Sequence, residues 1–401
     1  MSERWPIVKL SDVADLCLGK MLDANKNKGR PLPYLRNPNV RWFEVDTSDL
    51  RMMPFEEHED GRYGLRRGDV VICEGGEAGR AAVWDGRIPN LKFQKAIHRV
   101  RPSHQLDARF LVHQLLADSQ SGRLADYYTG ATIKHLTHQD LARYRFPLPP
   151  LAEQRRIAEI LDKADALRAK RHAALVQLDT LTQSIFLDMF GDPKKNLNRW
   201  PERSLAEIGV EFRYGSSNRS AADGKWTLRI PNVVGGSINL DDLKRVPVTR
   251  DELSRLCLQR GDLLFVRTNG NPDYVGRCAV YDPDAIRNHG FDGDDFIFAS
   301  YLIRGRIKPG AISPDFLREY LTTREGRRRL RTRSKTSAGQ YNINTQGLGS
   351  IQVLVPPANL QLEFTRRISI TDVVRRAIES SALELDVLFA SLQHRAFRGE
   401  L

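Results

Sequence analysis

Cysteine is scarce in this sequence of 401 residues, and its four cysteines are widely separated. No two of them form the Cys-x-x-Cys spacing of zinc and redox sites, so neither a disulfide framework nor a metal site is predicted. We expect Cys17, Cys73, Cys257 and Cys278 to be small, mostly buried side chains. The sequence also lacks an apolar run near the ~18 residues of a membrane helix, and its first residues lack a signal-peptide core. We therefore expect a cytoplasmic chain without membrane contact.

Motifs for catalysis are also missing. The sequence contains no Gly-x-x-x-x-Gly-Lys-Ser/Thr loop, which would bind phosphates, and no Gly-x-Gly-x-x-Gly after a strand. It contains no Asn/Asp-Pro-Pro-aromatic loop of an amino-methyltransferase and no Asp…Glu-x-Lys cluster of a nuclease. His135 and His138 could share a helical turn, but no third metal ligand lies near them in sequence. We expect a non-catalytic chain without a cofactor of its own.

Proline and glycine are absent from one long stretch, which begins after Pro149-Pro150 and ends at Phe190, before Gly191. Proline is tolerated at a helix start and glycine commonly ends a helix, so residues 151–190 are predicted to form one long helix. A similar stretch follows Pro356-Pro357 and predicts a second helix within residues 358–401.

The two predicted helices match each other. Each has a glutamine four residues after its second proline (Gln154 and Gln361) and a phenylalanine near its end (Phe190 and Phe397). Their apolar residues recur at steps of three, four and seven, so each helix needs a partner face. An antiparallel coiled-coil pair is favoured over two unrelated surface helices. The predicted contact residues are Ile157, Ile160, Ala164, Leu167, Ala174, Leu178, Leu181 and Ile185 in the first helix, and Ile370, Val374, Ala377, Leu385, Leu388 and Leu392 in the second.

The segments around the helices repeat each other. Leu65-x-Arg67-Gly68-Asp69-Val70 returns as Leu258-x-Arg260-Gly261-Asp262-Leu263, and each copy continues into a short apolar strand. The expected fold is α+β. It consists of two similar mixed α/β domains from an internal duplication, separated by two long antiparallel coiled-coil helices. The predicted bounds are 1–150 for the first domain, 151–190 for the central helix, 191–357 for the second domain and 358–401 for the C-terminal helix.

The basic charge lies in the two repeated segments. Residues 1–150 hold 23 Lys and Arg against 19 Asp and Glu, and residues 191–357 hold 27 against 19, whereas both helices are neutral. Together they account for the net charge of +12. A basic excess confined to the globular segments suits a polyanion such as double-stranded DNA, although it would also suit a solubilising surface.

These features resemble the specificity (S) subunits of type I restriction–modification enzymes. The resemblance is carried by the run PLPPLAEQRRIAEILD (147–162), by Val355-Pro356-Pro357 in the second copy, by both Arg-Gly-Asp turns and by ICEGGEAGRAAVW (72–84). In the second copy Ala358-Asn359-Leu360-Gln361 replaces the Leu-Ala-Glu-Gln form.

The resemblance implies two target-recognition domains, each of which reads one half of a split DNA target. It implies that the paired helices set the spacer between the halves and dock two methyltransferase (M) subunits, which restriction (R) subunits then join. S-adenosylmethionine, ATP and Mg²⁺ would bind on those partners. Two alternatives remain: a stand-alone DNA methyltransferase or nuclease with degenerate motifs, and a coiled-coil scaffold that binds no DNA. The charge distribution argues against the scaffold.

Candidate DNA-binding residues are the cations, amides and histidines of both repeated segments, because such side chains contact phosphates and base edges. Arg324, Arg328, Arg331 and Lys335 have a helical spacing that would place them on one face, which could line DNA or simply be solvated. The loop around Thr129–Thr132 precedes two of the first-copy candidates. The candidates are Arg80, Gln94, Lys95, His98, Arg99, Lys134 and His135 in the first domain, and Arg267, Asn269, Asn271, Arg324, Arg328, Arg331, Lys335, Gln340 and Asn342 in the second.

Overall fold

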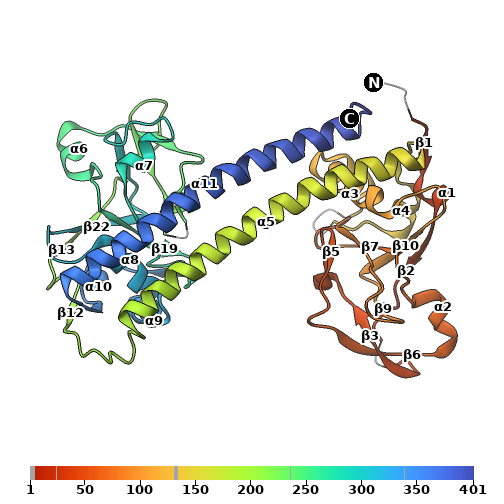
Figure 1. Ribbon diagram of the computed structural model, residues 1–401, viewed down its shortest axis with the longest axis horizontal. Coiled ribbons are helices and arrows are strands. Elements are labelled where there is room, and N and C mark those ends of the chain that lie inside the picture. The colour runs from red at the N-terminus through yellow and green to blue at the C-terminus, as the bar shows by residue number, and fades with distance from the viewer. Residues whose placement is uncertain (1–4, 24, 131–133, 235, 338) are drawn as a thin grey trace. The chain divides into compact units, whose positions relative to one another are not determined.

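The chain forms two compact units. The structure is a computed structural model that describes residues 5–23, 25–130, 134–234, 236–337 and 339–401. Unit 1 contains Met1–Ala173 and Glu379–Leu401, and unit 2 contains Ala174–Ile378. Both dividing points lie inside the long helices α5 (Leu151–Phe190) and α11 (Ala358–Ala396), so each unit holds part of both helices (Figure 1). None of the helices in the described part of the chain combines the length and hydropathy needed to cross a membrane.

Unit 1 consists mainly of short strands with a few helices. Before α5 its elements are β1 (Ile7–Lys9), α1 (Leu10–Val13), β2 (Ala14–Leu18), β3 (Arg30–Leu35), η1 (Asn37–Asn39), β4 (Val40–Arg41), β5 (Glu44–Val45), β6 (Arg51–Phe55), η2 (Glu57–Glu59), α2 (Asp60–Tyr63), β7 (Val70–Cys73), β8 (Ala81–Val83), β9 (Lys92–Phe93), β10 (Ile97–Pro102), α3 (Ala108–Gln120), η3 (Arg123–Tyr127), α4 (His138–Arg143) and β11 (Arg145–Pro147).

Unit 2 repeats this composition between α5 and α11. Its elements are β12 (Glu202–Ser204), β13 (Val210–Tyr214), β14 (Lys225–Leu228), η4 (Ile230–Asn232), β15 (Val233–Val234), β16 (Ser237–Ile238), β17 (Lys244–Val246), α6 (Arg250–Leu256), β18 (Leu263–Val266), β19 (Thr268–Asn269), β20 (Cys278–Val280), α7 (Pro283–Arg287), β21 (Phe296–Phe298), β22 (Leu302–Ile307), α8 (Pro314–Thr322), α9 (Arg324–Arg333), β23 (Lys335–Ser337), β24 (Gln340–Asn342), α10 (Thr345–Gly349) and β25 (Gln352–Leu354).

The two units have the same sheet topology, which confirms the predicted duplication. The four-stranded sheet β2-β10-β7-β8 of unit 1 corresponds to β13-β22-β18-β20 of unit 2. A second sheet has the order β6-β3-β9 in unit 1 and β17-β14-β21 in unit 2, and in both units its central strand has one antiparallel and one parallel neighbour. The central strands β7 and β18 are buried along their whole length, as expected from their uninterrupted apolar sequences.

The Arg-Gly-Asp turns belong to this shared framework. In unit 1, Arg101 donates from Nε and Nη2 to both carboxylate oxygens of Asp69, at 2.7 and 2.8 Å. In unit 2, Arg306 makes the same bidentate pair with Asp262, at 2.8 and 2.6 Å. Both aspartates are almost fully buried, so each turn is tied to the neighbouring strand of the large sheet by a charge-assisted contact. The turns therefore have a structural role.

The long helices pair antiparallel, as predicted. In unit 1, Arg168 of α5 bonds Asp386 of α11 at 2.6 Å and lies over the Phe389 ring. In unit 2, Asp179 forms an ion pair with Arg375 at 2.7 Å. Asp179 lies further along α5 than Arg168, whereas Arg375 lies earlier in α11 than Asp386. Contact partners therefore run in opposite directions along the two helices.

The predicted contact stripe is only partly correct. Ile157 and Ala164 are buried, but Leu167 and Leu181 of α5 and Ile370, Val374 and Leu388 of α11 are exposed. The prediction followed a seven-residue spacing, and a straight helix of 3.6 residues per turn drifts away from that spacing. At neighbouring positions the buried side chains are Thr182 and Phe186 in α5 and Thr371, Ala382 and Phe389 in α11.

A buried glutamine fastens the start of each long helix to its unit. Gln154 Oε1 accepts from the backbone N–H of Asp107, the N-cap of α3, at 2.8 Å, while its Nε2 donates to the Gln105 and Pro149 carbonyls. Gln361 Oε1 accepts in the same way from Ser313 N–H, the N-cap of α8, at 2.7 Å, and its Nε2 donates to Pro356 O. The two glutamines that match in the sequence therefore make equivalent contacts, and their exposed fractions are 0% and 5%. We call each of them a glutamine clamp.

The matched phenylalanines close the opposite ends of the helices. Phe190, the last residue of α5, packs in unit 2 on Phe316 of α8 with ring centroids 4.8 Å apart. Phe397, just beyond α11, packs in unit 1 on Phe110 of α3 at 5.7 Å. Each unit is therefore completed by the start of one long helix and the end of the other.

We predict that Gln154→Ala lowers the unfolding free energy of the full chain by roughly 2–4 kcal/mol, because it leaves a buried donor and two carbonyls without partners. Thermal or urea unfolding measures the change. Gln177→Ala, at an exposed position of α5, is the matched control and should shift stability by less than about 0.5 kcal/mol. Equal changes in unfolding free energy for both substitutions would show that buried Gln154 contributes no more to stability than an exposed side chain of α5.

Candidate nucleic-acid interface

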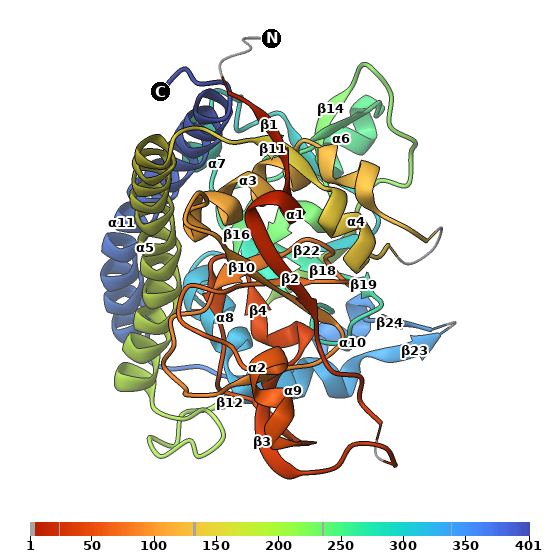
Figure 2. The same ribbon diagram turned by 90° about the vertical axis from the view of Figure 1, so that its right-hand side faces the viewer.

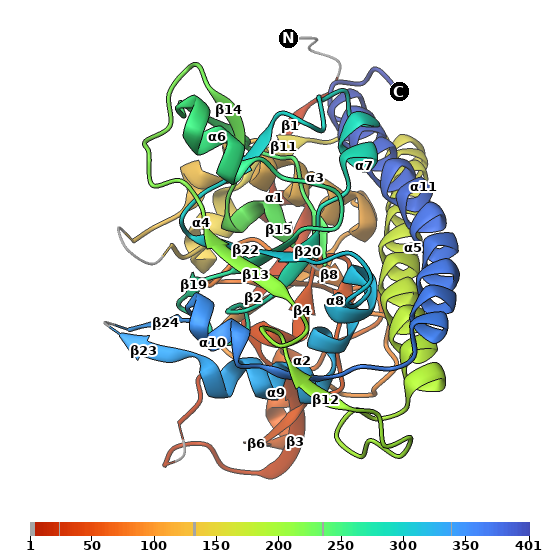
Figure 3. The ribbon, with the colours of Figure 1, turned by 90° about the vertical axis from the view of Figure 1, so that its left-hand side faces the viewer.

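A small sheet in unit 2 gathers polar residues that are distant in sequence. Its strands have the order β19-β24-β23 and are antiparallel; we call it the hairpin sheet. Thr268, Asn342 and Lys335 lie opposite one another across its three strands, and opposite residues share a face. Figure 3 shows the β23–β24 hairpin on the side of unit 2 away from α11. Four candidates thus belong to one sheet: Asn269, Lys335, Gln340 and Asn342.

Arg267, just before this sheet, is held in position by its neighbours. Its guanidinium lies over the Tyr214 ring, 4.8 Å from the centroid, and Nη1 donates to Ser300 O at 3.2 Å. Asn269 and Asn271 shape the following loop, because their side-chain oxygens accept from the backbone N–H two residues ahead, both at 2.9 Å. Arg267 therefore retains most of its five donors, whereas the side-chain oxygen of each asparagine already accepts one hydrogen bond.

The predicted basic helix is shorter than expected. Helix α9 ends at Arg333, with Ser334 as its C-cap, so Lys335 lies on strand β23 and not on the helix. The prediction of four cations on one helical face is therefore wrong for Lys335. Arg324 is exposed and has no side-chain partner among the described residues, whereas Arg331 is ion-paired with Asp273.

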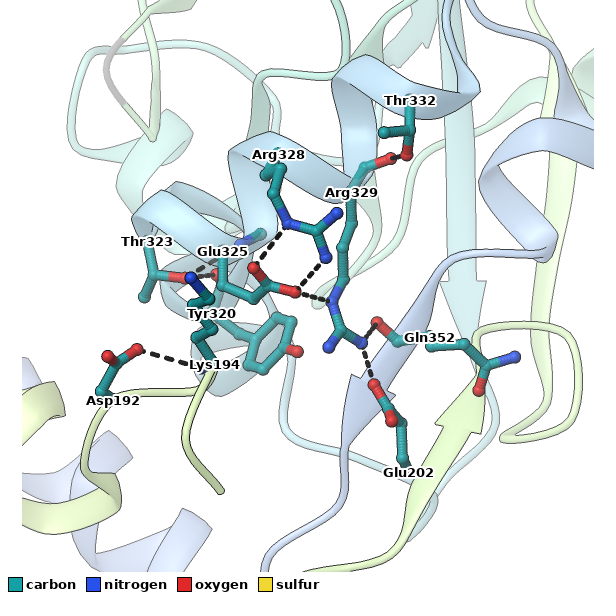
Figure 4. Close-up of polar contacts among 11 residues, drawn as sticks. Asp192, Lys194, Glu202, Tyr320, Thr323, Glu325, Arg328, Arg329, Thr332 and Gln352 are labelled. Atoms are coloured by element: carbon teal, nitrogen blue, oxygen red, sulfur yellow. Dashed lines mark hydrogen bonds and ion pairs between the residues drawn. The ribbon is translucent and has the colours of Figure 1, made fainter. Parts of the chain in front are cut away.

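Much of the charge on α9 is neutralised internally (Figure 4). Glu325 accepts from Arg328 at 2.6 and 2.7 Å and from Arg329 at 2.7 Å, and Arg329 continues to Glu202 and the Gln352 carbonyl. The hydrogen bonds from Arg328, with those from Arg329, lower the pKa of Glu325 to about 2. Because this pKa lies below the ordinary 4.5, the pairing stabilises unit 2 at pH 7, and its contribution disappears as the pH falls towards 2.

Three candidates of unit 1 are already bonded to other residues of the unit. Arg80 donates to Glu77 and to both oxygens of Asn37. Arg99 is 3% exposed, ion-paired with Asp15 and bonded to Arg62 O. His98 is fully buried, and Nε2 lies 2.8 Å from Leu136 O. Burial lowers the pKa of His98 to about 4, so its ring is neutral at pH 7 and can donate from Nε2 to this carbonyl. In this structure these side chains support the unit from within.

The other candidates of unit 1 lie nearer the surface. Lys95 is exposed and Gln94 is half-buried, on the turn between β9 and β10. His135 pairs with Thr129 as an antiparallel bridge, and the exposed Lys134 lies 5.9 Å from the centre of the Tyr128 ring. Ala131 and Thr132 lie outside the described residues. In Figure 2 helix α4, which begins three residues after His135, is on the side of unit 1 away from α5.

The two hairpins are anchored at equivalent points. In unit 1, Leu136 N–H donates to Glu74 O at 2.7 Å; in unit 2, Ile343 N–H donates to Arg267 O at 3.0 Å. Glu74 was not among the sequence candidates. Val70 and Leu263 are equivalent in the sequence repeat, so the residues four positions later, Glu74 and Arg267, are equivalent as well. This alignment could have identified Glu74 as a candidate.

Each unit offers hydrogen-bond donors and acceptors to a partner. In unit 2 the accessible groups are a guanidinium, carboxamides and the ammonium of Lys335. In unit 1 they are an ammonium, an imidazole and a carboxylate. These groups match the types that contact DNA phosphates and base edges.

Comparisons with known proteins point to the same role. The family model described as "Type I restriction modification DNA specificity domain" matches residues 2–177. The specificity subunit of the EcoKI restriction enzyme of Escherichia coli K12 is 26% identical over 427 residues, covering 100% of this chain and 90% of the relative. The StySPI specificity subunit of Salmonella potsdam is 24% identical with the same coverage.

Solved structures share the fold. The S subunit of a type I restriction–modification system from M. genitalium has a TM-score of 0.58 at 15% identity, covering 99% of this chain and 96% of that one. A chain from a study of complex assembly and conformational transition of the type I R-M system has a TM-score of 0.51 at 16% identity, covering 99% and 98%.

We predict that Arg324→Ala and Lys335→Ala each reduce the salt dependence of binding to duplex DNA of unrelated sequence. If each cation contacts one phosphate, the slope of log K against log salt should become shallower by about 0.9 per substitution. Arg376→Ala, at an exposed position of α11, is the control and should leave the slope unchanged. Unchanged slopes in both test variants would mean that these cations are merely solvated.

Proposed function

Since this chain belongs to the specificity subunits of type I restriction–modification systems, we propose that it reads a bipartite DNA sequence, one half with each unit. The observation that carries this proposal is that the two units share their framework but differ in the residues of their hairpins. The sheets have the same strand order in the two units, and the Arg-Gly-Asp turns and glutamine clamps make the same contacts. The hairpins at equivalent positions carry different residues. Such a pair of units presents two different recognition surfaces on one scaffold.

We propose a division of labour between contacts in each unit. Arg324 and Lys335, which are exposed and unpaired among the described residues, contact phosphates and fix the register on the duplex. Arg267, Gln340 and Asn342 in unit 2, with Lys134 and His135 in unit 1, contact base edges. Arg328 and Arg331 add to the positive potential of α9 while remaining in their ion pairs.

We further propose that the chain has no catalytic activity of its own. The sequence lacks phosphate-binding, methyl-donor and nuclease motifs, and the relatives are named as specificity subunits. Methylation and cleavage would be performed by methyltransferase and restriction subunits, which would also bind S-adenosylmethionine, ATP and Mg²⁺. No observation favours the alternative of a stand-alone methyltransferase or nuclease.

The long helices provide a surface for such partners. In both units they expose several large apolar side chains, and exposed apolar surface can mark interaction sites. We propose that two methyltransferase subunits dock on this surface. The exposed residues are Leu167, Leu383, Val387 and Leu388 in unit 1, and Val176, Leu181, Leu187, Leu362, Ile370, Val373 and Val374 in unit 2.

We also propose that the helix pair sets the unread gap between the half-sites. α5 has 40 residues, and at a rise of about 1.5 Å per residue such a helix is roughly 60 Å long. Antiparallel contacts hold it to α11 within both units. A paired rod without proline or glycine is far stiffer than a loop.

The first test is replacement of residues 1–150 by the equivalent segment of a relative, in cells that also carry the methyltransferase subunit. Sequencing of the methylated sites should give a two-part motif for the parent chain. The chimera should change one half and keep the other half and the gap. A change in both halves would refute the assignment of one half-site to each unit.

The second test lengthens both helices. Inserting four residues after Ala173 of α5 and four after Ile378 of α11 adds about one turn, or ~6 Å, to each. With ~3.4 Å per base pair, the gap in the methylated motif should grow by one to two pairs while both half-sites stay the same. The control insertion lies in the loop after Asp192, which lengthens the chain but not the helices. Methylation by the assembled long-helix variant at the original gap would show that the helices do not set the spacing.

A further inference from the structure

The two units carry opposite charges at one structurally equivalent position. Strands β7 and β18 are the same element of the repeat, and the next residue is Glu74 in unit 1 and Arg267 in unit 2. Glu74 N–H donates to Ala96 O at 2.9 Å, and Arg267 N–H donates to Tyr301 O at 3.0 Å. Each of these residues also accepts, through its carbonyl, the bond that anchors the hairpin. The two backbones are therefore held by the same pair of hydrogen bonds, while the side chains have opposite hydrogen-bonding capacity.

Neither side chain is required by the interior of its unit. Glu74 is only half-buried, and its carboxylate has no hydrogen bond or ion pair among the described residues. Arg267 uses one donor for Ser300 O and rests on the face of Tyr214, which leaves the other edge of the guanidinium available. A structural role would call for a similar residue at both sites, as is found at Asp69 and Asp262.

The hairpin lies directly beside this position in unit 1. A Cβ atom on Gly75 would be only 3.0 Å from His135 Nδ1, so glycine allows the imidazole to approach the backbone next to Glu74. In unit 2, Thr268 follows Arg267 and donates from Oγ1 to Gln340 Oε1 at 3.0 Å. A molecule that contacts the hairpin side chains therefore meets residue 74 or 267 as well.

The negative charge of Glu74 determines which groups of DNA it can contact. DNA phosphates repel a carboxylate, so an unpaired glutamate on a DNA-facing surface opposes non-specific binding. It becomes favourable opposite an exocyclic amine in the major groove, because glutamate accepts from cytosine N4. Arginine has the complementary capacity and donates in a bidentate manner to guanine O6 and N7.

We propose that residues 74 and 267 are equivalent base-reading positions: Glu74 accepts from the amine of a cytosine in one half-site, and Arg267 donates to a guanine in the other. The inference rests on the proposed function, because it assumes that each unit reads one half-site. The inference adds two points to that function: which residue of each unit discriminates between bases, and which base that residue selects.

The first experiment compares the methylated motifs of complexes that contain the parent chain, Glu74→Gln or Arg267→Gln. Glutamine pairs with adenine N6 and N7, so Glu74→Gln should relax one cytosine position of the first half-site towards adenine by about 10- to 100-fold. Arg267→Gln should do the same at one guanine of the second half-site. Each substitution should leave the other half-site unchanged. Glu57→Gln, which removes an exposed carboxylate from the η2 turn, is the control and should change neither half.

The outcomes separate the inference from the proposed function. A two-part parental motif that both variants leave unchanged overturns the inference and leaves the proposed function intact. A parental motif without two parts overturns the proposed function itself. Changes in both halves from a single substitution also overturn the inference, because each residue would then act on the whole assembly.

A second experiment measures DNA binding by the purified assembled complex, on a site chosen from the result of the first. Replacing the guanine that Arg267→Gln relaxes by 7-deazaguanine removes N7, and it should weaken binding of the parent complex by roughly tenfold. The same replacement should have little effect on the Arg267→Gln complex, which has already lost the contact. Equal weakening of both complexes would show that Arg267 does not contact that base, and would overturn its assignment.

Discussion

The buried glutamine at the start of each long helix is the contact on which the arrangement of each unit depends. Its side-chain oxygen accepts from the N-cap residue of a short helix, and its amide donates to the carbonyl of the proline-rich entry. One side chain thus joins three segments, and because it is buried, water cannot replace the lost bonds. The long helix is fixed to the globular part at its first turn, and the phenylalanine at the end of the other helix closes the same region.

The residues that the two units share and the residues that differ between them have different places in the fold. The Asp–Arg pairs, the buried strands β7 and β18 and the glutamine clamps are the same in the two copies. The hairpins and the residues at their anchors differ. Since the backbone at the anchor is held by main-chain hydrogen bonds, its side chain can change from glutamate to arginine without a loss of framework contacts. This separation lets one scaffold present different surfaces.

Net charge overstates the number of cations available to a partner. Unit 2 contains a strongly basic helix, but Glu325, Glu202 and Asp273 hold Arg328, Arg329 and Arg331 in ion pairs. In unit 1, Arg99 and Arg101 are held by Asp15 and Asp69. Arg324 and Lys335 are different, because they are exposed and have no side-chain partner among the described residues. A count of basic residues cannot make this distinction, since it depends on which carboxylates lie nearby in space.

Local patterns in the sequence were enough to determine the duplication, the two long helices and the start of each at a double proline. These features follow from proline, glycine and apolar spacing, which act over a few residues. The face on which α5 meets α11 was only partly predictable, because the pitch of a real helix moves the contact line away from a seven-residue spacing. Only the tertiary structure decided that His98 and Arg99 lie inside and that Lys335 lies on a strand. Those facts depend on strand pairing between residues far apart in the chain, where a shift of one residue would turn every side chain to the opposite face.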